Sequence, residues 1–109
     1  MAALALEAAR GSRVRCSTEA ECRKAFQLAQ IFVSTKSDMK IQLATDTIIE
    51  TYNPTEGYKL GAKVIKTPLA GQAAEIVIAV TCSSCNVEMR KVQLRLMSDF
   101  RPYIESRLR

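Results

Sequence analysis

Four cysteines in two close pairs constrain this chain more than any other feature of its sequence. Five residues separate Cys16 from Cys22, two separate Cys82 from Cys85, and the 109-residue chain contains no histidine. An even number of cysteines in a small domain is typical of a disulfide framework formed in an oxidising compartment. The pattern therefore predicts an exported domain held together by structural disulfides.

The sequence leaves the pairing of these cysteines open. Local pairing joins Cys16 to Cys22 and Cys82 to Cys85, and the short spacings favour it. The rival pairing joins Cys22 to Cys82 and Cys16 to Cys85. It closes larger loops, and so removes more entropy from the unfolded chain.

Two other roles for the cysteines, a zinc site and a redox pair, have weaker support in the sequence. Structural zinc usually takes two tight ligand pairs, and only Cys82-x2-Cys85 has that spacing. A thiol–disulfide redox protein is an alternative, because a CxxC pair before a helix lies where the helix dipole lowers a thiolate pKa. However, no βαβ unit precedes the pair and no histidine or lysine adjoins it. We therefore expect no metal site and no cofactor.

Hydrophobic periodicity predicts an α+β fold with the order α-β-β-β-α. The sequence Thr18-Glu-Ala-Glu21 has the form of a capping box and predicts a helix over 19–34. The other predicted elements are a strand over 39–52, either continuous or in two segments joined by a bulge at 44–46, strands over 58–67 and 74–82, and a helix after Asn86. Pro102 lacks an N–H, so this last helix either stops near Arg101 or kinks and runs on to 108. Short connections favour a three-stranded antiparallel meander packed against the two helices.

The two ends of the chain carry its excess of positive charge. The net charge is +5, and residues 1–15 and 90–109 are basic while the middle is close to neutral. We expect residues 1–15 to be a mobile basic arm or a remnant that contributes little to the fold. Residues 16–109 are predicted to form a single disulfide-stapled domain.

The residues for catalysis are missing. The sequence has no Cys/His or Ser/His/Asp combination and no Gly-rich phosphate loop. Asp46 and Glu50 are the carboxylates close enough to suspect as a pair, and solvated strand positions explain them better. The chain is predicted not to be an enzyme.

We expect this domain to bind another envelope protein, or itself, through an exposed edge strand, which the first or second predicted strand would provide. Candidate contact residues are Tyr52 and Tyr58 beside the 53–57 turn, and Arg90 and Lys91 on the last helix. The alternative is a module like the double-stranded RNA-binding domain, which has the same element order. That domain's Gly-Pro-x-His-type loop is missing, so no nucleic-acid partner is expected.

Several segments of the chain resemble a family of uncharacterised exported or lipoprotein domains of proteobacteria. They are Cys16-Ser-Thr-Glu-Ala-Glu-Cys22, Ala29-Gln-Ile-Phe-Val33, Met39-Lys-Ile-Gln-Leu-Ala-Thr-Asp46 and Glu50-Thr-Tyr-Asn-Pro54. The resemblance implies a periplasmic or outer-envelope location and paired cysteines, and it supplies no activity. The signal peptide is expected to have been removed, and membrane anchoring through a segment outside this sequence stays open.

Overall fold

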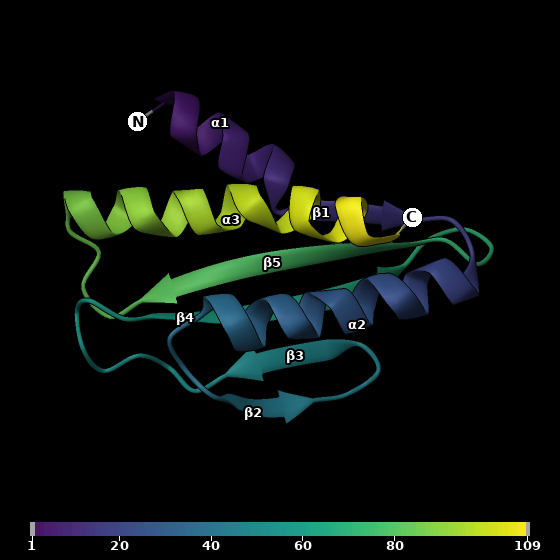
Figure 1. Ribbon diagram of the computed structural model, residues 1–109, viewed down its shortest axis with the longest axis horizontal. Helices are drawn as coiled ribbons and strands as arrows, with labels where there is room; N and C mark the ends of the chain where they lie inside the picture. Colours follow the sequence, from purple (N-terminus) through teal and green to yellow (C-terminus); the bar gives the residue numbers. More distant parts are fainter. Residues whose placement is uncertain (1, 109) are drawn as a thin grey trace.

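A single antiparallel sheet, covered on one face by helices, organises the protein. The computed structural model describes residues 2–108, and this part of the chain forms three helices and five strands in an α+β fold (Figure 1). The elements are α1 (Ala2–Gly11), β1 (Arg13–Cys16), α2 (Glu19–Lys36), β2 (Ile41–Ala44), β3 (Ile48–Thr51), β4 (Leu60–Pro68), β5 (Ala74–Cys82) and α3 (Val87–Leu108). The strand order across the sheet is β1-β5-β4-β3-β2.

The α+β class agrees with the sequence-based prediction, but the element order and the three-stranded meander do not. Residues 2–15, expected to belong to a mobile basic arm or a remnant, form α1 and the first three residues of the edge strand β1, in which Val14 is buried. The expected bulge at 44–46 is a hairpin turn instead. There the backbone N–H of Thr45 donates to the Ile48 carbonyl at 2.8 Å, and the Thr45 hydroxyl accepts from two turn N–H groups.

Helix α2 begins with the capping box that the sequence indicates. The Thr18 hydroxyl accepts a hydrogen bond from the N–H of Glu21, and the Glu21 carboxylate accepts one from the N–H of Ser17. These two bonds satisfy backbone donors that have no partner inside the helix. The helix therefore starts at a defined residue and presents one apolar stripe to the sheet. Its buried residues are Cys22, Ala25, Phe26, Ala29, Phe32 and Val33.

Helix α3 continues through Pro102, the second of the two expected outcomes. A proline cannot donate a hydrogen bond, so the carbonyl of Ser98, four residues earlier, loses its usual partner. Helix α1 packs against this point: a Cβ added at Gly11 would overlap the backbone of Ser98. Glycine at position 11 thus allows α1 to lie directly against α3 (Figure 1).

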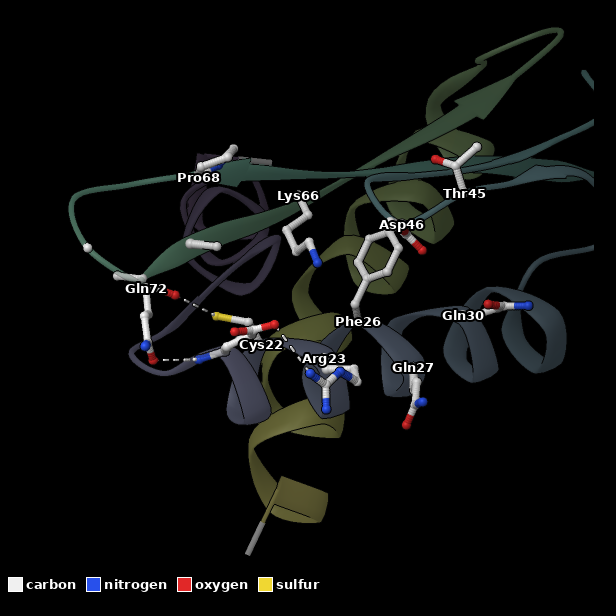
Figure 2. A pocket seen from close by; sticks show the side chains of 14 residues that line it. Cys22, Arg23, Phe26, Gln27, Gln30, Thr45, Asp46, Lys66, Pro68 and Gln72 are labelled. Carbon is white, nitrogen blue, oxygen red and sulfur yellow. Dashed lines mark hydrogen bonds and ion pairs between the residues drawn. The ribbon is translucent and has the colours of Figure 1, made fainter.

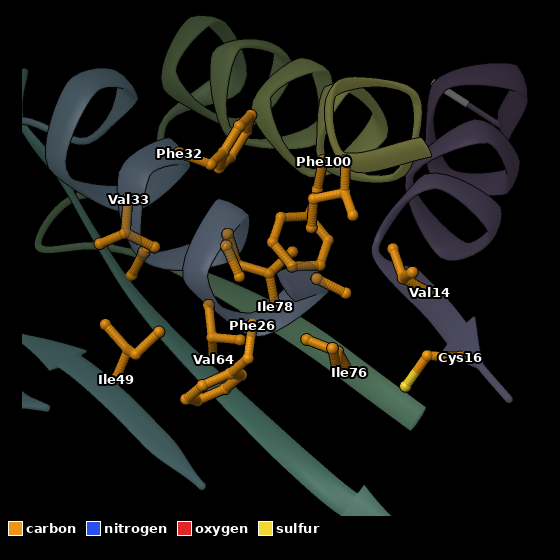
Figure 3. Packing of buried hydrophobic residues seen from close by; sticks show 14 of the residues in the cluster. Val14, Cys16, Phe26, Phe32, Val33, Ile49, Val64, Ile76, Ile78 and Phe100 are labelled. Atoms are coloured by element: carbon orange, nitrogen blue, oxygen red, sulfur yellow. The ribbon is translucent and has the colours of Figure 1, made fainter. Parts of the chain in front are cut away.

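The core lies between the sheet and the two helices α2 and α3 (Figure 3). Phe32 of α2 and Phe100 of α3 meet edge to face with ring centroids 5.4 Å apart, above Val64, Ile76 and Ile78 of the sheet. No helix covers the opposite sheet face in the described part of the chain, where Ile65 and Ala79 are exposed. Within residues 2–108, no helix is long and apolar enough to cross a membrane.

Candidate functional site

The structure joins the cysteines in the local pairing. Cys16 at the end of β1 is bonded to Cys22 in the first turn of α2, with Cα atoms 5.1 Å apart. Cys82 at the end of β5 is bonded to Cys85, with Cα atoms 5.7 Å apart. The first pair belongs to the core, whereas Cys85 is exposed. The first disulfide therefore fastens the edge strand β1 to α2, and the second closes the turn between β5 and α3.

The described residues do not gather the donors of a metal site. Within residues 2–108, no three side chains of the His, Cys, Asp and Glu types lie close enough together to hold an ion. Asp46 lies in the turn between β2 and β3, and Glu50 on β3 pairs with Lys63 of β4 at 3.8 Å. The structure thus gives these two suspected carboxylates separate surroundings.

A cavity of about 570 Å³ opens between α2 and the turns at one end of the sheet (Figure 2). Most of the polar groups around it already have partners within the protein. Arg23 pairs with Glu19 at 3.4 Å, and the backbone N–H of Glu19 donates to the side-chain oxygen of Gln72. The Lys66 ammonium lies over the Phe26 ring, 5.2 Å from its centroid. The side chains of Gln27, Gln30 and Asp46 also line the cavity without a hydrogen bond or ion pair among the described residues, but all three are exposed and nothing fixes them toward one ligand.

A second cavity, of about 400 Å³, lies along the open half of the outer edge of β5, and we refer to it as the β5 slot. Strand β1 pairs with β5 only from Ala74 to Val77, whereas β4 pairs with β5 over its whole length. Just before β1 the chain turns away into α1, so within residues 2–108 no strand pairs with β5 on that side beyond Ile78, and α3 runs alongside it instead (Figure 1). The residues lining the slot are Ala9, Ser12, Arg13, Val77, Ile78, Ala79, Val80, Arg90, Gln93, Leu94 and Met97.

The backbone of β5 directs hydrogen-bonding groups into this slot. The N–H of Ile78 donates to the Ser12 carbonyl at 3.0 Å, so Ile78 faces the β1 side. Successive residues of an antiparallel strand alternate the side to which their N–H and C=O point. The N–H and C=O groups of Val80 and Cys82 therefore point to the same outer edge, beyond the start of β1. Backbone groups without a strand partner at a sheet edge form a template for an added strand.

Gln93 of α3 occupies part of the place of the missing strand. Its amide nitrogen donates to the Val80 carbonyl at 2.6 Å. Its amide oxygen is buried and has no hydrogen-bond partner in the described part of the chain. A buried acceptor left without a donor costs about 1–3 kcal/mol. The side chain of Gln93, which lines the slot, therefore holds one buried acceptor without a donor among the described residues.

The edge at β2 is less suited to strand addition. This strand has only four residues, and its pairing with β3 shifts register between Ile41 and Leu43. The side-chain amide of Gln42 donates to the Thr51 carbonyl at 3.1 Å. Short, irregular edge strands discourage pairing with another chain. The second predicted strand, β4, is paired on both sides and offers no edge.

The structure separates the four predicted contact residues. Tyr52 and Tyr58 are exposed beside the loop between β3 and β4, and a hydrogen bond to Glu56 raises the pKa of Tyr58 above its usual value. On α3, Arg90 lines the β5 slot, while Lys91 pairs with Glu88 at 3.6 Å. Only Arg90 of these four residues belongs to the slot lining.

Sequence reasoning missed Gln93 as a member of the site, together with the contribution of α1. Gln93 was not singled out because its role depends on how α3 lies along β5. The neighbouring wall residue Ala9 belongs to a segment predicted to be a mobile arm. No sequence signal marked either contribution, because the length of β1 beside the strand at 74–82 is known only from the structure.

Comparisons with known proteins add no further assignment. No family model matches the chain, and no curated protein or solved structure is significantly similar to it.

Proposed function

We propose that this chain is a non-catalytic domain of an exported protein, and that it binds an extended segment of a partner protein by strand addition in the β5 slot. The observation that carries the proposal is the outward-facing backbone of Val80 and Cys82, which lies beside a cavity and beyond the start of β1. Main-chain hydrogen bonds supply the affinity in this mode of recognition, and the flanking side chains supply the specificity.

The walls of the slot favour a polypeptide occupant. Leu94 and Met97 of α3 offer apolar surface on one side, and Ala9 at the end of α1 leaves room on another. A strand added there would extend the sheet in line with β1. The Cys16–Cys22 disulfide fixes β1 to α2, and this keeps the closed end of the slot in place.

An exported location is part of the same proposal. Small exported domains use disulfides because their cores bury little surface, and here both cysteine pairs are bonded. In protein isolated from its native compartment without reductant, disulfide mapping by mass spectrometry should find the 16–22 and 82–85 bonds. Four free thiols in such a preparation would contradict the exported location.

Binding in the slot is tested with random decapeptides displayed on phage and selected against the oxidised chain. Ala9 lines the slot and Ala5 does not, and both are exposed on α1. We expect Ala9→Trp to weaken the selected peptides at least tenfold because its ring occupies the slot, whereas Ala5→Trp leaves their affinity unchanged. Equal binding to both variants, or a selection that yields no binder, would contradict the proposed function.

One observation favours a second candidate, thiol–disulfide exchange at Cys82 and Cys85. Cys85 is exposed and comes directly before Asn86, whose side chain caps α3 by accepting from the N–H of Met89 at 2.9 Å. Helix N-termini stabilise a thiolate. In glutathione buffers of graded potential, an exchange protein should cycle this pair reversibly while Cys16–Cys22 stays oxidised. A purely structural role predicts that both bonds persist until the protein unfolds.

A further inference from the structure

We infer that the partner segment bound in the β5 slot carries an acidic side chain, which pairs with Arg90 at the open end of the slot. This inference rests on the proposed function and adds the chemical nature of the partner. Three features of the slot support it: the charges on its lining, the direction of α3, and the free state of Arg90.

The lining of the slot has positive charge and no negative charge. Arg13 and Arg90 are its ionisable members, and no Asp or Glu belongs to the lining among the described residues. The two arginines differ in availability. Arg13 is already paired with Glu75 of β5 at 3.1 Å, whereas Arg90 takes part in no ion pair within residues 2–108. An incoming carboxylate therefore finds its free partner at Arg90.

The two ends of the slot also differ in electrostatic character, and the end beside Arg90 is the one that favours negative charge. Arg90 lies in the first turns of α3, where its backbone N–H donates to the Asn86 carbonyl at 2.8 Å, and the helix dipole makes this end positive. At the other end α1 finishes and β1 begins, so helix carbonyl groups face that region. A carboxylate is thus favoured beside the start of α3 and disfavoured beside the end of α1. The end of the slot beside Arg90 is also open, so the partner chain can continue beyond it.

The main-chain groups of β5 place the acidic residue relative to the strand. Gln93 is one turn after Arg90 on α3, and its amide contacts the Val80 carbonyl. Arg90 therefore lies on the Cys82 side of Val80. The segment we infer pairs its backbone with Val80 and presents Asp or Glu toward α3 near Cys82. An arginine on a carboxylate can form two parallel hydrogen bonds, which fixes register as well as adding affinity.

Charge reversal with a matched control tests the inference. Arg90 and Arg95 are both exposed on α3 and lack ion pairs in the described chain, but only Arg90 lines the slot. We expect phage-displayed decapeptides selected on the oxidised chain to be enriched in Asp or Glu at one position. Arg90→Glu should weaken them at least tenfold and Arg95→Glu less than twofold. Replacing the enriched acidic residue of the peptide by Gln or Asn should abolish the difference between the variants.

The outcomes separate this inference from the proposed function. Peptides that bind in the slot, and are blocked by Ala9→Trp, but show no acidic enrichment would overturn the inference and leave strand addition standing. Equal losses in Arg90→Glu and Arg95→Glu would overturn it too, since they would indicate only a general effect of net charge. We expect the chain alone to be monomeric by light scattering at high concentration. A dimer that Ala9→Trp dissociates would identify the occupant as a second copy of the chain and overturn the inference.

Discussion

Replacing Phe100 by alanine is expected to lower the free energy of unfolding by about 3–5 kcal/mol. The side chain is completely buried, and its ring packs edge to face on Phe32 at the junction of α2, α3 and the sheet (Figure 3). Phe32 also contacts Tyr103, with ring centroids 5.2 Å apart, so the truncation would disturb an aromatic cluster. The loss is large because domains of this size are stable by only about 5–15 kcal/mol.

Urea unfolding of the oxidised protein measures this loss. Val92→Ala is a matched control, because Val92 lies on the same helix and is 46% exposed. We expect that control to change stability by no more than about 0.5 kcal/mol. Similar small losses in both variants would show that α3 does not pack on the sheet through Phe100.

Removing the Cys16–Cys22 disulfide by Cys16→Ala with Cys22→Ala is expected to cost about 2–4 kcal/mol. The two cysteines are six positions apart, so the bond closes a short loop, and chain entropy accounts for about 2.4 kcal/mol of the loss. Both side chains belong to the core, and their truncation removes packed sulfur atoms. The variant should also loosen β1, the edge strand that this bond holds to α2.

Cys82→Ala with Cys85→Ala provides the comparison. That bond joins residues three positions apart, and Cys85 is exposed, so its loss should cost less in the same urea experiment. Hydrogen exchange at Val14 should become faster in the first variant and stay unchanged in the second. A larger loss of unfolding free energy on removing Cys82–Cys85 than on removing Cys16–Cys22 would contradict the assignment of the main stabilising role to Cys16–Cys22.

The sequence predicts best the elements whose pattern is local. Strand β5 has the predicted bounds 74–82, and α2 begins at the residue that its capping box indicates. The interpretation of residues 2–15 as part of an arm was wrong, because a short Ala/Leu stretch followed by Gly11 looks like an arm when its partner is unknown. Their order comes from contacts distant in sequence: Gly11 against Ser98, and Val14 opposite Ile76. Tertiary packing of this kind leaves no periodic signal in a four-residue strand.

The candidate site, too, could be predicted from the sequence only where the signal is local. Arg90 was singled out from its charge and its place near the start of a helix, which are visible in the sequence. The slot beside it depends on β1 beginning opposite Val77 and on Gln93 reaching Val80. Both are properties of strand register and helix placement. An edge becomes open or closed only when the neighbouring strand's length is known.

The most direct test of strand addition in the β5 slot is amide hydrogen exchange by NMR. Exchange is measured on the oxidised chain, free and saturated with a selected decapeptide. The N–H groups of Val80 and Cys82 should exchange at least tenfold more slowly in the complex, because they become hydrogen-bonded to the added strand. Unchanged exchange at both residues, with new protection confined to 41–44 of β2 or to the loop bearing Tyr52 and Tyr58, would contradict the account.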